Sequence, residues 1–238
     1  MASSAADLTS RLLRHERGIL LAAILLLATF SWFLVLRGMT MEMQPPLWAL
    51  VVMWSVMMTA MMLPSATPAI LLYAHVRRSR EDVSAIAEPW VFLAGYLLVW
   101  LLFSIVAALI QTQIPGTSMG LKSRAAQGAL LIAAGLYQLS PLKSACVSQC
   151  RSPARFISRY WRAGSWGAVR LGILHGLYCV GCCWALMALL FVGGVMNLIW
   201  VIGLTVLVTA EKLLPNGKAV QFISGAALIP WGAYLLST

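Results

Sequence analysis

The feature that most constrains this fold is a series of long apolar segments with almost no charge. About 20 consecutive apolar residues are enough to cross the hydrocarbon core of a bilayer as a helix. The 238 residues are 61% hydrophobic and only 10% charged, which leaves too little polar surface for a soluble domain. We therefore predict an all-α fold, a polytopic bundle of transmembrane helices.

Seven segments have the length and apolarity of membrane-spanning helices. They are Gly18–Leu36, Leu47–Tyr73, Pro89–Ile110, Ala125–Ser140, Gly167–Val192, Val195–Ala210 and Ala219–Leu236. A six-helix bundle with one re-entrant segment is the alternative. Because no linker interrupts residues 18–238, we expect a single transmembrane helical domain there, preceded by a basic cytoplasmic tail at residues 1–17.

Lysine and arginine residues gather on one side of this predicted bundle. All but Arg37, Lys122 and Arg124 lie in the tail or beside the connections after the second, fourth and sixth segments. The positive-inside rule places that side in the cytoplasm, so the N-terminus is inside and, with seven helices, the C-terminus is outside. Topology thus accounts for the net charge of +10. We expect contact with membrane lipid and no binding to nucleic acid.

The stretch HGLYCVGCCWALM holds four candidate metal ligands within the fifth segment. On an ideal helix Cys179, Cys182 and Cys183 lie at about 40°, −20° and 80° from His175, so the four share one face. Thiolates with an imidazole bind Cu(I), Zn(II) or iron–sulfur clusters. Single cysteines usually pack as small hydrophobes, but ionisable groups gathered at membrane depth indicate a functional site. We predict a metal site here.

Methionine is concentrated in the second segment, which carries a row of candidate soft ligands. These are Met53, Met57, Met58, Met61 and Met62. A methionine row at helical spacing is often packing, but thioethers bind Cu(I) or Ag(I) and do little for zinc. Methionine together with the cysteine segment therefore favours Cu(I) over Zn(II).

The predicted depths of these residues in the membrane suggest an order in which a metal ion could pass from one ligand group to the next. Met39, Met41 and Met43 lie on the predicted outer side, before the methionine row descends toward the cysteine segment. Cys146 and Cys150 follow the fourth segment on the cytoplasmic side, where they form a predicted inner exchange site. This order requires the second and fifth segments to touch.

Several short motifs, spread from Leu47 to Lys218, occur together. They are Trp54-x-x-Met57-Met58-x-Ala60-Met61-Met62-x-Pro64, Gly95-Tyr96, Tyr137-Gln138-x-x-Pro141-x-Lys143-x-x-Cys146-x-x-x-Cys150-Arg151-x-Pro153, His175-Gly176-x-Tyr178-Cys179-x-Gly181-Cys182-Cys183-Trp184, Met196-Asn197 and Glu211-Lys212. With them the chain resembles the bacterial predicted metal-binding integral membrane protein family, a domain of unknown function often labelled copper chaperone. Members often carry His before the second loop cysteine, where this chain has Gln149, which weakens the loop as a complete metal site.

The resemblance implies metal binding in a multi-pass protein of the bacterial inner (cytoplasmic) membrane. Our leading hypothesis is that Cu(I) is bound for delivery or for transport across that membrane, with a periplasmic or cytoplasmic copper-carrying protein as partner. No phosphate loop, hydrolase elbow or paired-carboxylate motif is present in the sequence, so we do not expect an enzyme. Two alternatives stay open: a thiol–disulfide redox protein that uses Cys179 and Cys182, and a transporter for mercuric or silver ion.

Overall fold

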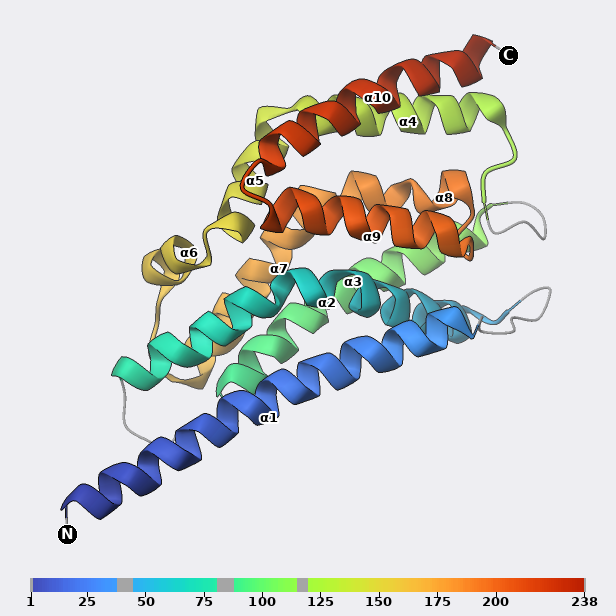
Figure 1. Cartoon of the computed structure of the whole chain (residues 1–238). Coiled ribbons are helices and arrows are strands. Elements are labelled where there is room, and N and C mark those ends of the chain that lie inside the picture. The colour runs from blue at the N-terminus through green and yellow to red at the C-terminus, as the bar shows by residue number, and fades with distance from the viewer. Residues whose placement is uncertain (1, 38–44, 81–87, 115–119, 238) are drawn as a thin grey trace.

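The computed structural model describes residues 2–37, 45–80, 88–114 and 120–237, with the side chains of residues 2–17 and 78–80 left out. Every regular element in these ranges is a helix, as predicted. The helices are α1 Ala2–Leu36, α2 Leu47–Arg80, α3 Glu88–Thr112, α4 Arg124–Leu139, α5 Pro141–Arg151, α6 Pro153–Tyr160, α7 Gly164–Ala188, α8 Leu190–Gly193, α9 Leu198–Leu213 and α10 Gly217–Ser237. The start of α1 and the end of α10 lie at opposite ends of the bundle (Figure 1).

Fewer helices than predicted are long and apolar enough to cross a bilayer. Within the described residues five pass this test, and they are Gly18–Leu36, Leu47–Arg77, Glu88–Thr112, Gly164–Gly193 and Gly217–Ser237. The bent pair of α4 and α5, at 63° to each other, makes a sixth if it is one span. The sixth predicted segment forms α9, whose 16 residues reach about 24 Å, less than the hydrocarbon thickness of about 30 Å. Which side faces the cytoplasm stays a prediction.

Glycines allow the helices around α7 to approach closely. A Cβ atom on Gly172 of α7 would lie 2.1 Å from the carbonyl oxygen of Phe92 in α3, and one on Gly95 of α3 would lie 2.7 Å from the carbonyl oxygen of Val169. Small residues of this kind let helix backbones come together in membrane proteins. The close packing holds the next turn of α3, which carries Tyr96, against the cysteine-bearing part of α7.

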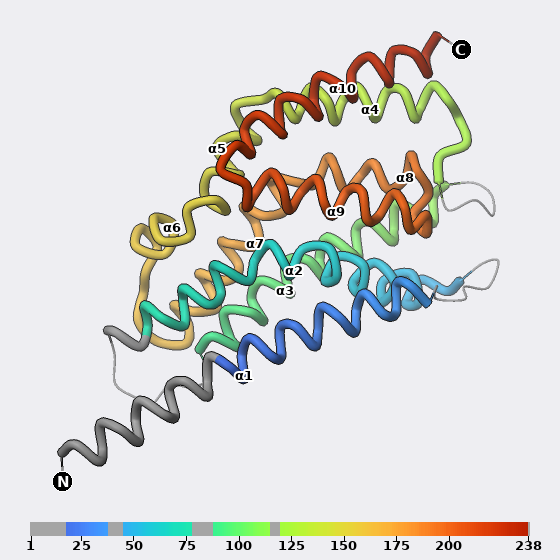
Figure 2. Tube along the Cα trace, viewed as in Figure 1, coloured from blue at the N-terminus to red at the C-terminus, as the bar shows by residue number. Residues whose placement is uncertain are grey.

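The bend between α4 and α5 brings a short helix back toward α7. Ser140 ends α4 and also begins α5, where its hydroxyl accepts a hydrogen bond from the backbone N–H of Lys143 at 3.2 Å. Pro141 at the first position of α5 suits a helix start, because its missing N–H is not needed there. α5 then packs on α7, as do α3, α4, α8 and α9; Figure 2 traces this return of the chain.

Two lysines assigned to connections by the sequence are instead inside the bundle. Lys143 of α5 is fully buried, and Lys212, one residue before the end of α9, is 5% exposed. Both were counted among the exposed basic residues beside connections, and their burial within helices corrects that placement, whereas their assignment to the cytoplasmic side stays a prediction. The arginines that follow in Arg151–Arg170 still keep basic residues concentrated in this region of the chain.

Candidate metal centre

Cys179 lies at the centre of the buried polar groups in the bundle. Its sulfur is 3.0 Å from Nζ of Lys212, which comes from α9, and 3.2 Å from the hydroxyl of Tyr96, which comes from α3. Cys179 is 1% exposed, and both neighbours are also buried. An ammonium group this close can compensate the negative charge of a thiolate, so the geometry suits a soft anionic ligand.

Cys182 and Cys183 share the predicted face with Cys179, and their thiols turn back toward the helix backbone. They donate to the carbonyl oxygen of Cys179 at 3.1 and 2.8 Å respectively. The sulfur of Cys183 is also 3.8 Å from the thioether sulfur of Met62 in α2. The second and fifth predicted segments, now α2 and α7, therefore touch at a pair of sulfur atoms.

The two cysteines of α5 reach the same region from another side. The side chain of Cys150 lies close enough to those of Cys179 and Cys182 to interact with them electrostatically. Cys146 packs on Gly181 of α7, where a Cβ atom would lie 3.0 Å from its sulfur. The sequence assigned Cys146 and Cys150 to a separate inner exchange site, but the fold gathers all five cysteines around one turn and a half of α7.

His175 is buried one turn before Cys179, inside a cage of rings. Its imidazole centroid lies 5.3 Å from that of Phe156, 5.7 Å from Tyr96 and 6.0 Å from Phe92. Its Nδ1 has no hydrogen-bond partner among the described residues. A buried nitrogen without a partner is costly, which is consistent with a side chain whose partner is a ligand that arrives from elsewhere.

The methionines of α2 are all buried, but they do not gather at one point. The set comprises Met53, Met57, Met58, Met61 and Met62, each 2% exposed or less. Met62 faces the cysteines, whereas Met53 and Met57 line a cavity at the other end of the row. Met39, Met41 and Met43 lie outside the described residues.

These groups form a loose cluster rather than a finished coordination shell. In the described part of the chain no three His, Cys, Asp or Glu side chains converge closely enough to hold one ion as they stand. Because the Cys182 and Cys183 thiols point at a carbonyl, they would have to rotate about χ1 to face an ion beside Cys179.

Lys212 is the residue of this centre that the sequence reasoning missed. The adjacent pair Glu211-Lys212 entered the sequence analysis only as a short motif and not as part of the metal site, but the two side chains have different buried partners. Glu211 forms a buried ion pair with Lys143 at 2.6 Å and accepts a hydrogen bond from Gln138 at 2.6 Å. Side chains at neighbouring helix positions point about 100° apart. Two adjacent charged residues in an otherwise apolar helix therefore indicate that each one contacts a different partner, and this was the sequence signal for Lys212.

Comparison with known protein families identifies a similarity over most of the chain. The model of a family described as PpoB2, copper chaperone, matches residues 51–235, which is most of the chain. The match includes the methionines of α2, the cysteines of α5 and α7, and Lys212. No curated protein and no solved structure matches the chain.

Proposed function

The chain belongs to the PpoB2 copper chaperone family, and from this membership we propose that it binds Cu(I) at the cysteine cluster and passes it to a copper-carrying protein or across the bacterial inner membrane. A copper chaperone family implies a role in binding and delivery rather than catalysis. The observation that carries the proposal is the gathering of sulfur atoms from α2 and α5 around the three buried cysteines of α7.

The proposed central site uses Cys179, Cys182 and Cys183, with His175 one helical turn before Cys179. Soft ligands of this type select Cu(I) over harder divalent ions. Rotation of the two thiols away from the Cys179 carbonyl would release them for coordination. Cys146 and Cys150 supply further thiols next to the same site, so an ion could change ligands there without leaving the cluster.

The proposed approach to this site runs along α2. Met53, Met57, Met58, Met61 and Met62 are the soft ligands of that route. Met53 and Met62 are nine positions apart, which is about 14 Å along the helix. Met62 is the last of them and contacts Cys183, so it is the point at which thioether ligands give way to thiolates.

The charge of Lys212 makes this site favour a monovalent ion over a divalent one. Two thiolates and Cu(I) carry one negative charge, which the ammonium of Lys212 neutralises at contact distance from Cys179. Two thiolates and Zn(II) are neutral, so the same ammonium would leave one uncompensated positive charge in a buried site, which is unfavourable. Charge balance thus supports Cu(I) over Zn(II).

The test is the metal content of the purified, reduced protein. We expect bound copper in the wild type and loss of the tightly bound copper in Cys182→Ser/Cys183→Ser. The matched control is Ala185→Ser, which places a hydroxyl at another buried position of α7 and should retain copper. A wild type without copper, or a double variant with as much copper as the wild type, would contradict the proposal.

The two alternatives give different results in related assays. A redox protein would form a mixed disulfide with a partner. Cys179 and Cys182 are free thiols at i and i+3 of a continuous helix, which would have to distort for the two to form a disulfide with each other. A mercuric or silver ion transporter would alter growth on those ions, whereas a copper protein would alter growth on copper.

A further inference from the structure

A small cavity lies among α1, α2 and the start of α9, away from the cysteine cluster. Its volume is about 40 Å³, and three of its seven lining residues are methionines: Met53, Met57 and Met196. The other four, Val35, Val195, Leu198 and Val201, are aliphatic. A volume of about 10–15 Å³ already holds one water molecule, so the cavity has room for an ion.

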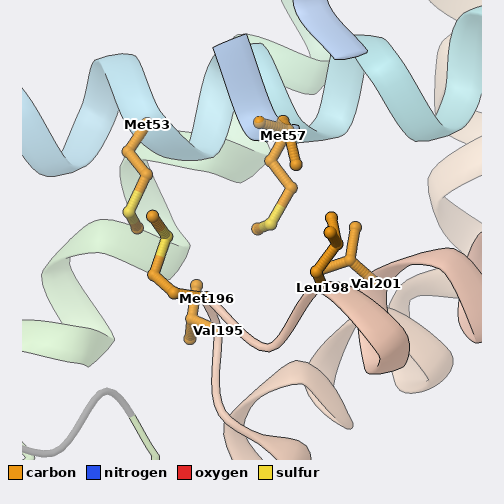
Figure 3. Close-up of a pocket in the computed structure, with 7 residues that line it drawn as sticks. Met53, Met57, Val195, Met196, Leu198 and Val201 are labelled. Carbon is orange, nitrogen blue, oxygen red and sulfur yellow. The ribbon is translucent and has the colours of Figure 1, made fainter. Parts of the chain in front are cut away.

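The chain holds Met196 at this cavity through the sharp connection between α8 and α9. Gly194 has a φ of +89°, a conformation that glycine adopts without strain. Trp200 packs on Gly193 and donates its indole N–H to the carbonyl oxygen of Leu189 at 2.6 Å. These contacts fold the connection back, so that Met196 points toward Met53 of α2, and Met57 extends into the cavity from the same helix (Figure 3).

The chemistry of the lining restricts what can occupy the cavity. The lining is mostly apolar, and its side chains carry no nitrogen or oxygen to bind water, so the cavity does not hold water well. Hard cations need oxygen ligands, and the lining side chains supply none. Three thioethers are neutral, soft ligands that suit a monovalent soft ion.

We propose that Met53, Met57 and Met196 form a second metal site, a thioether site that holds Cu(I) before it reaches the cysteines. The identity of the ion rests on the proposed function, but the site is tested separately from the cysteine cluster. Met53 and Met57 are 2% exposed, whereas Met196 is only partly buried. Met196 is thus the ligand that can be reached first, and the two methionines of α2 receive the ion in the interior.

The order of affinities follows from ligand charge. Three neutral thioethers hold Cu(I) more weakly than thiolates do, because no ligand charge offsets that of the ion. The cavity and Cys183 are separated along α2 by about 14 Å, the rise from Met53 to Met62. An ion therefore moves from a weak site to a strong one along a single buried helix.

The experiment is a Cu(I) titration of the full-length protein in detergent, with ascorbate as reductant and a chromophoric chelator as competitor. We expect one tight and one weaker equivalent in the wild type. Met53→Leu/Met196→Leu should remove the weaker equivalent and keep the tight one, because leucine preserves volume but offers no sulfur. Cys182→Ser/Cys183→Ser should do the reverse. Met57→Leu alone should weaken the second equivalent at least tenfold.

The matched control is Met187→Leu, since Met187 is equally buried but does not line the cavity; it should keep both equivalents. Size-exclusion elution at the wild-type position confirms that each variant is folded. A weaker equivalent that is absent from the wild type, or that survives in Met53→Leu/Met196→Leu, overturns the proposal. A tight equivalent that survives in Cys182→Ser/Cys183→Ser would instead count against the cysteine site.

Discussion

Replacing Lys212 by methionine removes the only charge that contacts Cys179 in the described part of the chain. The ammonium nitrogen is 3.0 Å from the Cys179 sulfur. A metal–thiolate bond is about 2.3 Å long, which places a bound ion up to about 5 Å from the nitrogen. With an effective dielectric constant of about 20, a unit charge pair at this distance contributes about 3 kcal/mol.

We therefore expect Lys212→Met to weaken Cu(I) binding roughly a hundredfold, since about 1.4 kcal/mol corresponds to a factor of ten. The expectation holds for an ion bound by two thiolates, whose complex carries one negative charge. Zn(II) with the same two ligands is neutral, so its affinity should stay unchanged or rise. The substitution should therefore reduce the ratio of the Cu(I) affinity to the Zn(II) affinity.

Competition against chromophoric chelators measures both affinities, under reducing conditions for Cu(I). Lys218→Met is the control, because Lys218 is an exposed lysine on the next helix and its removal should change neither affinity by more than about threefold. A Cu(I) affinity that is unchanged or higher in Lys212→Met would refute the reasoning. It would mean that one thiolate binds the ion, or that Lys212 competes with copper for Cys179.

Two further predictions concern the scaffold and are measured by thermal unfolding in detergent. Glu211→Ala leaves Lys143 buried without its carboxylate and should destabilise the protein by about 3–5 kcal/mol. Adding Lys143→Met should restore most of that stability. A double variant that is no more stable than Glu211→Ala would contradict a direct ion pair. Gly172→Ala should destabilise the protein by more than about 2 kcal/mol, because its Cβ would lie 2.1 Å from the backbone oxygen of Phe92. Gly203→Ala, with nothing within 4 Å of its Cβ, should be neutral or stabilising. Equal effects at the two glycines would show that the close packing of α3 and α7 does not determine stability.

The sequence predicted those features that depend on helical periodicity. The all-α class is confirmed, and His175, Cys179, Cys182 and Cys183 are all buried, each 2% exposed or less. Periodicity within one helix is a local property, so it can be read without knowing the neighbours.

The parts that were not predicted depend on which helices meet. Nothing local in α5 shows that it folds back at 63° to place Cys150 beside Cys179. Lys212 follows a charged residue at a helix end, which resembles a residue at the membrane surface until the partner of each side chain is known. The span count differed because apolarity was recognised more easily than length, as the 16 residues of α9 show.

Burial of the sulfur cluster has a consequence for the oxidation state of a bound copper ion. Cu(II) prefers nitrogen and oxygen ligands in a tetragonal arrangement, and the buried faces of α2 and α7 offer mainly sulfur. An apolar shell that excludes water also shifts the reduction potential of a metal site. A copper ion held beside Cys179 would therefore be kept in its reduced form and away from oxygen while it waits for an acceptor.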